Sequence, residues 1–353
     1  MFALSFGEFL LRAMGGSRKP GKSRPLFHNL NFKKMRSLNS IRVFLFLALF
    51  SVYSQTLTAQ KVVADHRESG DFFGQTVSMG GGYAFVGAPK DNVEHPDQSY
   101  HTDMGTVYVF KQNSAQVWEQ VGKIVPPSQD ATRFFGHCIE VDSDLLIIGA
   151  KGDNNGNGAA VYICNKKTSG EWAIESKLDI SGIKNIQDVG IVSASDGQYA
   201  FVGGGSNVNI YKREDANWPI YQTIEGGKPR GFGEALDVFE DYLIVGESLG
   251  GKTLNGKAYL YKKSGTQWTE IQEFEPYDFG PYSVGSRFGQ SVAIQSDNIF
   301  IGSPKEGPGY VYLYQNQGGN WNKLQKIQAE QGSLKDQFGC SIDAGSSGKL
   351  LIG

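Results

Sequence analysis

A unit of roughly fifty residues recurs after Gln60, and this repeat restricts the folds open to the chain more than any other feature. Its clearest copy spans residues 288–327. This copy contains a Phe-Gly pair, an alternating stretch, an apolar run ending in Gly, an aromatic–aliphatic run and a Trp. Alternation with period two places one set of side chains on each face of a β-strand. The linking turns are rich in Gly, Asn, Asp and Ser, so each unit predicts four short antiparallel strands.

A four-stranded sheet with two open faces buries too little area to be stable alone, so the units must pack on one another. Repeats of this length and strand number are typical of a β-propeller. We predict an all-β propeller of four-stranded antiparallel blades, with five complete blades and part of a sixth, from a parent ring of six or seven. A degenerate unit starts at Val189-Gly190. The residues predicted to pack between blades are the repeated aromatic ones: Phe73, Phe135, Phe232, Phe288, Phe338, Trp118, Trp172, Trp218, Trp268 and Trp321.

The first unit carries a family signature. Phe73-Gly74, then an apolar strand and Gly87-Ala88-Pro89, resembles the FG-GAP repeat, which builds the N-terminal propeller of integrin α subunits and occurs in many secreted bacterial proteins. The resemblance extends over about residues 61–353. It implies a secreted or cell-surface binding or adhesion module without catalysis, whose partner is an extracellular protein or glycan.

Two rival functions stay open. One is a propeller enzyme, or the non-catalytic propeller of a larger secreted enzyme; the other is a spacer in a surface protein. A funnel with paired carboxylates of perturbed pKa favours an enzyme, because such groups perform acid–base chemistry. Clustered charged or aromatic loops on one face favour binding, and featureless faces favour a spacer.

The N-terminal region has a different character from the repeats. Residues 1–34 are basic and are interpreted as an upstream extension from a mis-called start, or as a cytoplasmic tail. Residues 35–59 combine arginines, a short apolar run and small residues before Gln60, which predicts a signal peptide. Residues 60–353 form the predicted propeller. It ends at the second strand of a sixth unit, so we expect a truncated ring whose last blade is completed by the segment after Gln60.

Charge separates these regions as well. The chain has a net charge of −2, but nine of its 34 basic residues and one of its 36 acidic residues lie in residues 1–42, so the remainder carries −10. An acidic propeller is a poor partner for nucleic acid or an anionic membrane. After signal cleavage, no membrane insertion is expected.

The sequence contains no convincing catalytic set. The pattern around Ser248 matches G-x-S-x-G, but a strand follows it and every His precedes it, which excludes the usual order of Ser, acid and His. We therefore predict no catalytic residue and no cofactor. Calcium is kept as an alternative at Asp153, Asn155 and Asn157, although residue 164 is a Cys where a calcium loop needs a Glu.

Two loops are candidates for contact with a partner. The longest insertion, residues 90–104, lies between the second and third strands of the first unit, and its His and carboxylate side chains are also possible transition-metal ligands. The second is an aromatic cluster near residue 280. The candidate contact residues are Asp91, Glu94, His95, Asp97, His101, Asp103, Tyr277, Phe279 and Tyr282.

Overall fold

The structure is a computed structural model. It describes residues 60–353 except 67, 143, 154–156, 184–191, 196, 227–230, 252–253, 277–284 and 346–347, with backbone only at 192–195. The signal-peptide prediction therefore lies outside the described residues. The described part contains β-strands and turns and no α-helix, which confirms the all-β class.

The described residues form five four-stranded antiparallel sheets and a shorter sixth. The first contains β1 (Thr76–Gly80), β2 (Tyr83–Ala88), β5 (Thr106–Gln112) and β6 (Trp118–Ile124), with a hairpin of β3 (Val93–Glu94) and β4 (Tyr100–His101) inserted. The second contains β7 (Phe135–Asp142), β8 (Leu145–Ala150), β9 (Ala160–Lys166) and β10 (Trp172–Lys177). The third contains β11 (Val192–Ser195), β12 (Tyr199–Gly204), β13 (Asn207–Lys212) and β14 (Ile220–Glu225).

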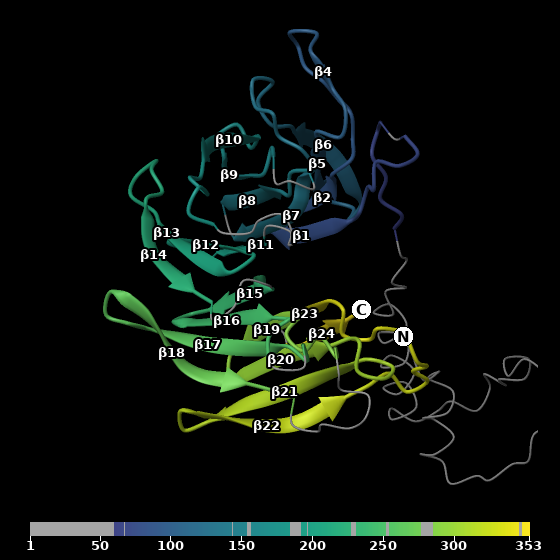
Figure 1. Ribbon diagram of the computed structural model, residues 1–353. Coiled ribbons are helices and arrows are strands. Elements are labelled where there is room, and N and C mark those ends of the chain that lie inside the picture. The colour runs from purple at the N-terminus through teal and green to yellow at the C-terminus, as the bar shows by residue number, and fades with distance from the viewer. Residues whose placement is uncertain are drawn as a thin grey trace, which may run out of the picture. The chain divides into compact units, whose positions relative to one another are not determined.

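The fourth sheet contains β15 (Phe232–Phe239), β16 (Tyr242–Glu247), β17 (Lys257–Ser264) and β18 (Gln267–Phe274). The fifth contains β19 (Val292–Gln295), β20 (Asn298–Ser303), β21 (Tyr310–Gln317) and β22 (Asn320–Ile327). The sixth consists of β23 (Ile342–Ala344) and β24 (Leu350–Ile352). The first strands β1, β7, β11, β15, β19 and β23 contact one another in chain order. The sheets therefore pack around a common axis, as in a propeller (Figure 1).

The phenylalanine of the Phe-Gly pair packs edge-on against a tyrosine of the third strand of its own sheet. The ring centroids are 5.6 Å apart for Phe73 and Tyr108 and 5.5 Å apart for Phe135 and Tyr162. The fourth and fifth sheets repeat the pair. In the third sheet, Asn209 occupies the tyrosine position where the sequence also lacks the phenylalanine, so both members of the pair are replaced together.

A pair of glycines sets the closest approach of neighbouring sheets. A Cβ on Gly87 of β2 would lie under 3.0 Å from the backbone carbonyl oxygen of Gly136, which belongs to the second Phe-Gly pair. The Thr76 hydroxyl also donates a hydrogen bond to this carbonyl at 2.7 Å. Gly203, Gly246 and Gly302 meet the corresponding carbonyls of the following sheets. Side chains are excluded here because backbone lies against backbone.

The tryptophans connect each sheet to the one before it. Trp172, near the start of a fourth strand, lies edge-on against Phe85 of the preceding sheet at 5.0 Å between ring centroids. Trp268 packs in the same way against Phe201 at 5.2 Å. The amide of Gln222 then brackets the Trp268 backbone, donating to its carbonyl at 2.8 Å and accepting from its N–H at 2.9 Å. Each junction of this kind combines an apolar contact with a directional one.

The segment after Gln60 repeats this bracket on the first sheet. Gln60 donates to the Trp118 carbonyl at 2.8 Å and accepts from the Trp118 N–H at 2.7 Å. Ala64 is buried in a cluster with Tyr108 and Phe110. The segment therefore makes the contact that the outer strand of a preceding sheet makes elsewhere in the ring.

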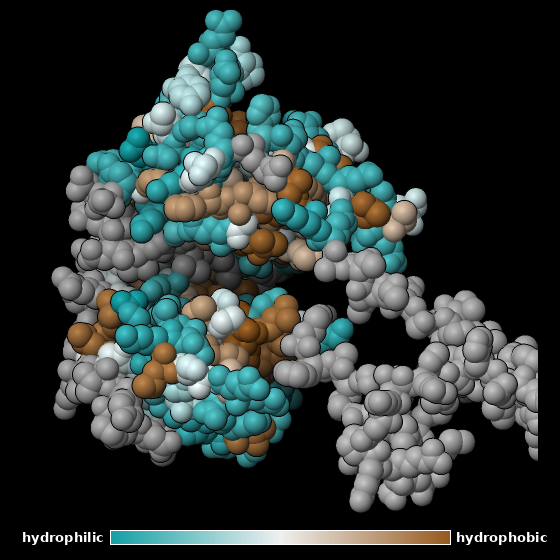
Figure 2. Space-filling view, turned by 90° about the vertical axis from the view of Figure 1, so that its right-hand side faces the viewer, coloured by the Kyte–Doolittle hydropathy of each residue, from teal (hydrophilic) through white to brown (hydrophobic). Residues whose placement is uncertain are grey.

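Figure 2 shows the side of the molecule that lies to the right in Figure 1, where a deep groove separates two groups of sheets. Hydrophobic surface lies on both lips of this groove. The exposed apolar residues at the two ends of the array include Val77 and Met79 on β1 (56% and 63% exposed) and Leu351 on β24 (69%). The described part of the chain supplies no third strand to the β23–β24 sheet.

Candidate functional site

The first strands of the sheets share a sequence position whose side chain, in the first and fourth sheets, reaches the first strand of the next sheet. It is the fifth residue after the phenylalanine of the Phe-Gly pair, or after the Val that replaces it. Carboxylates occupy it in the second, fourth and sixth sheets, so acidic groups alternate around the ring. In sheet order, the residues at this position are Ser78, Glu140, Ala194, Asp237, Ala293 and Asp343.

Two of these side chains bond to the neighbouring first strand. The Ser78 hydroxyl accepts a hydrogen bond from the Val141 N–H at 3.2 Å, and the Asp237 carboxylate accepts one from the Ile294 N–H at 2.7 Å. The second oxygen of Asp237 accepts the Val238 N–H at 2.8 Å. Among the residues that the structure describes, no backbone N–H of a neighbouring first strand bonds to Glu140 in this way.

The axial carboxyl groups are electrostatically coupled. Burial, and then the negative charges of Asp237, Asp142 and Asp343, raises the pKa of Glu140 to about 8. Burial also raises the pKa of Asp237 to about 7, against the lowering effect of its two backbone hydrogen bonds. The charge of Asp343 raises the pKa of both groups, and the charge of Asp237 raises that of Glu140. The carboxylates of the second, fourth and sixth sheets therefore lie within electrostatic range of one another. Carboxyl groups whose pKa lies near neutrality are suited to acid–base chemistry.

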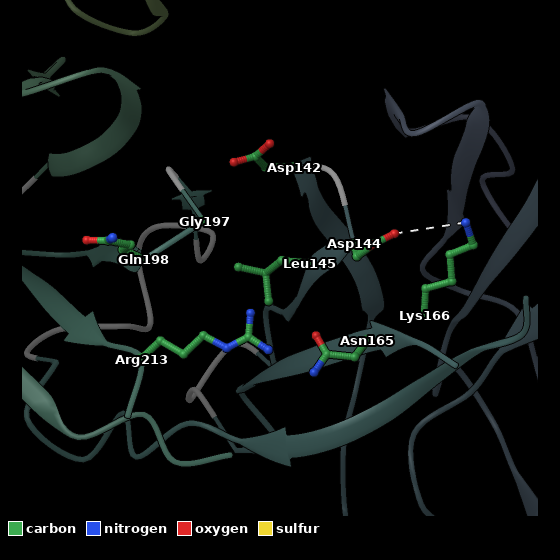
Figure 3. A pocket seen from close by; sticks show the side chains of 8 residues that line it. All are labelled: Asp142, Asp144, Leu145, Asn165, Lys166, Gly197, Gln198 and Arg213. Atoms are coloured by element: carbon green, nitrogen blue, oxygen red, sulfur yellow. Dashed lines mark ion pairs between the residues drawn. The ribbon is translucent and has the colours of Figure 1, made fainter. Parts of the chain in front are cut away.

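A pocket of about 510 Å³ lies beside the end of the Glu140 strand, between the turns of the second and third sheets (Figure 3). Asp142 lies two residues after Glu140 and on the same side of β7, and it lines this pocket with Gly197 of the next sheet. The side chains of Arg213 and Lys166 also line it, and Lys166 pairs with Asp144 at 3.9 Å. The pocket therefore offers both cationic and anionic groups next to the axial carboxylates.

Two of the three residues considered for calcium, Asp153 and Asn157, bond to each other. The Asp153 carboxylate accepts the Asn157 N–H at 2.9 Å and its side-chain amide at 3.1 Å. Asn155 lies outside the described residues. Across the described chain, no three His, Cys, Asp or Glu side chains are grouped closely enough to share a metal ion.

Of the two predicted contact loops, the structure describes the first and leaves the named residues of the second outside its described range. The insertion at 90–104 forms the β3–β4 hairpin, in which His95 is buried, and the Asp91 carboxylate accepts a hydrogen bond from the Tyr108 hydroxyl at 2.7 Å. Asp97 accepts hydrogen bonds from the hydroxyls of Ser99 and Ser128, which lowers its pKa to about 2. Tyr277, Phe279 and Tyr282 lie outside the described residues.

Ser248 follows the end of β16 in a turn, and no helix follows it. It is buried, and its hydroxyl donates a hydrogen bond to the Glu234 carboxylate. The adjacent Glu247 accepts a hydrogen bond from the Tyr259 hydroxyl at 2.7 Å. These contacts join strands of a single sheet.

Comparison with known proteins identifies the fold class of the chain and the family of its repeats. The fold is that of a β-propeller, and residues 57–110 and 118–164 match the model of the FG-GAP repeat. The chain therefore contains FG-GAP repeats, as its Phe-Gly and Gly-Ala-Pro motifs predicted. Such repeats are typically extracellular. Within the described residues, no helix has the length and hydropathy that crossing a bilayer requires. No curated protein sequence matches the chain.

Solved propellers of the gluconolactonase type share the fold. A periplasmic gluconolactonase of Pseudomonas aeruginosa, PpgL, aligns with a TM-score of 0.54 and 11% identity, covering 79% of this chain and 77% of that one. A putative 6-phosphogluconolactonase of Bacteroides fragilis aligns at 0.56 and 8% (79% and 76% covered). One from Bacteroides uniformis aligns at 0.57 and 9% (79% and 77% covered). At these identities the similarity concerns the fold.

These comparisons contradict the prediction of a binding or adhesion module without catalysis. All three solved propellers are described as lactonases, so the comparisons favour the alternative, a propeller enzyme. The axial carboxyl groups of raised pKa are also the feature stated above to favour an enzyme.

The sequence analysis missed Glu140, Asp237 and Asp343 because each lies in a different repeat. In isolation, each is one polar residue in an alternating strand. Aligning the Phe-Gly pairs would have placed the three acids at one position, and the ring then brings that position to the axis.

Proposed function

We propose that this chain is a propeller hydrolase whose acid–base pair is formed by Glu140 and Asp237. The observation that supports this most directly is the alternating set of carboxylates on the first strands, where burial, and to a lesser degree the neighbouring carboxylates, raises the pKa of both groups toward neutrality. Near pH 7.5, a group with a pKa of about 8 retains its proton and one with a pKa of about 7 has mostly lost it. One acid and one base are then present together.

The substrate class that we propose is a sugar lactone, because the solved propellers with this fold are described as gluconolactonases or putative 6-phosphogluconolactonases. Asp237 takes a proton from water as the water oxygen bonds to the lactone carbonyl carbon. Glu140 gives its proton to the ring oxygen as the bond from that oxygen to the carbonyl carbon breaks. The product is the open hydroxy acid, and a proton from Asp237 returns Glu140 to its starting state.

The cationic side chains at the ends of the third strands suit a polar or anionic substrate. Arg213 and Lys166 line the pocket next to the Glu140 strand, and Lys212 lines an adjoining one. A phosphate or carboxylate on the substrate forms charge-assisted hydrogen bonds with guanidinium and ammonium groups. We therefore expect the phosphorylated lactone to bind more tightly than the neutral one.

We further propose that the enzyme acts outside the cytoplasm. The predicted signal peptide at 35–59 and the usual occurrence of FG-GAP repeats in extracellular proteins support this location. N-terminal sequencing of the secreted protein tests it, with Gln60 expected as the first residue. Retention of residues 35–59 on the secreted protein would contradict the cleavage site.

The activity is tested by titrating the acid released from glucono-δ-lactone and from its 6-phosphate. We expect hydrolysis above the buffer rate, with a maximum between pH 7 and 8. Glu140→Gln and Asp237→Asn should each lower kcat by about 10²–10⁴-fold, the usual contribution of acid–base groups. Glu119→Gln removes an exposed carboxylate from β6 and is the matched control. Equal rates for parent and Glu140→Gln, or no hydrolysis by a folded parent, would refute the proposal.

A further inference from the structure

The hairpin inserted into the first sheet brings two imidazoles and a thioether together. His95 and Met104 are 7% and 1% exposed, and the His95 Nε2 lies 3.4 Å from the Met104 Sδ. The ring of His101 stands edge-on to that of His95, with 5.5 Å between centroids. In Figure 1 this hairpin, labelled β4, projects from the first sheet. It is separate from the axial carboxylates.

Hydrogen bonding within the hairpin leaves these groups poorly satisfied. A thioether sulfur is a weak hydrogen-bond acceptor, so its contact with the His95 nitrogen offsets little of the desolvation cost of burying that nitrogen. The His101 Nε2 is buried and has no hydrogen-bond partner among the described residues. A buried polar nitrogen without a partner destabilises the fold. His95 thus contacts both the Met104 sulfur and the His101 ring, and a ligand bound between these groups would satisfy the buried nitrogens.

The donor set selects a soft metal ion. Imidazole suits several transition metals, while a thioether favours Cu(I). With bond lengths like those of zinc, about 2.0–2.1 Å to nitrogen and about 2.3 Å to sulfur, a tetrahedral angle places the two donor atoms about 3.5–3.6 Å apart. The His95 nitrogen and the Met104 sulfur are 3.4 Å apart, so a shift of about 0.1–0.2 Å brings them to this separation.

The donors come from both sides of the hairpin turn and from the connection between β4 and β5. The β3–β4 pairing sets Val93 opposite His101, and His95 closes the turn by donating its N–H to the Ser99 carbonyl at 2.9 Å. The Met104 carbonyl accepts the Phe135 N–H of the second sheet at 2.8 Å. Met104 is thus anchored to the body of the propeller, while the histidines belong to the insertion.

We propose that His95, His101 and Met104 form a Cu(I) site. The ion fixes the hairpin against the propeller, because it joins both arms of the insertion to an anchored residue. This inference goes beyond the proposed hydrolysis and does not depend on it.

Titration of Cu(I) against the chromophoric chelator bicinchoninate, without oxygen and with ascorbate, tests the site. Cys138→Ser and Cys340→Ser are introduced first, because their thiols are accessible and also bind copper; Cys164 is buried. We expect one Cu(I) per chain, with an X-ray absorption spectrum that shows nitrogen and sulfur neighbours. Met104→Leu and His101→Gln should each weaken binding at least tenfold.

Matched controls separate the site from adventitious binding. Met79→Leu removes an exposed thioether and His66→Gln an exposed imidazole, and both should bind Cu(I) as the parent does. Cu(I) should also raise the melting temperature of the parent and of both controls, but not that of Met104→Leu. If Met104→Leu fails to fold, His101→Gln supplies the same comparison. Equal affinity in the parent, Met104→Leu and His101→Gln, or no Cu(I) bound by the parent, would overturn the proposal.

Discussion

The close glycine contact between sheets makes a sharp prediction for Gly87→Ala. The new Cβ would lie under 3.0 Å from the Gly136 carbonyl oxygen and from the Thr76 hydroxyl. The clash involves backbone, so relief requires the first and second sheets to separate. Overpacking costs about 1–3 kcal/mol. Disturbing the bond from Thr76 to Gly136 adds about 0.5–1.5 kcal/mol. We expect a loss of about 2–4 kcal/mol.

Gly122→Ala is the control, since no heavy atom lies within 4 Å of its Cβ and it belongs to the same sheet. Its effect should be neutral or stabilising by up to about 1 kcal/mol, because glycine loses more backbone entropy on folding. At about 2–4 °C per kcal/mol, differential scanning calorimetry should place Gly87→Ala about 5–10 °C below the control. Midpoints that agree within about 1 °C would show that the glycine pairs do not set the sheet spacing.

The remaining predictions concern the junctions, the axis and calcium. Trp268→Ala should destabilise by about 3–5 kcal/mol in a urea titration, against little change for the half-exposed Ile271→Ala on the same strand. Gln272→Ala, which removes the bracket around the Trp321 backbone, should cost about 1–2 kcal/mol by the same measurement. Because the folded protein holds a proton on Glu140 between pH 4.5 and about 8, stability falls as pH rises through that range. Glu140→Gln should therefore be more stable than the parent by about 5 kcal/mol at pH 9, and equally stable at pH 4. Millimolar calcium should leave the melting temperature unchanged, because the links between first and second strands are too short to supply six oxygen ligands.

The repeat made the fold predictable because its signals are local. Each motif predicts the turn or strand in which it lies, as Phe135-Gly136, the alternating strand and Trp172 do in the second unit. The same order of motifs applies to every copy of the repeat. The aromatic partner of Phe135 was not predictable in this way. Phe135 packs against Tyr162 on the third strand of its own sheet, and nothing in the sequence spacing distinguishes that contact from the expected contact between blades.

The candidate site depends on the ring rather than on the strand. Glu140 and Asp237 are almost a hundred residues apart, and their coupling arises when alternate sheets meet at the axis. Sequence spacing carries no information on such convergence. The thioether of Met104 was missed for another reason: only the His and carboxylate side chains of the 90–104 insertion were considered as metal ligands, and Met104 is an apolar residue whose burial also fits a core position.

The third sheet differs from its neighbours in a way that bears on assembly. Buried Asn209 replaces the repeated tyrosine, and its amide group bonds to Thr223, Asn207 and Tyr211 within the same sheet. Repeats with nearly identical apolar surfaces are interchangeable, and wrong docking is a characteristic failure of such chains. A buried polar network tolerates few alternative partners. We therefore expect the third sheet to dock against fewer alternative neighbours than the other sheets do, which favours the native order of the sheets during folding.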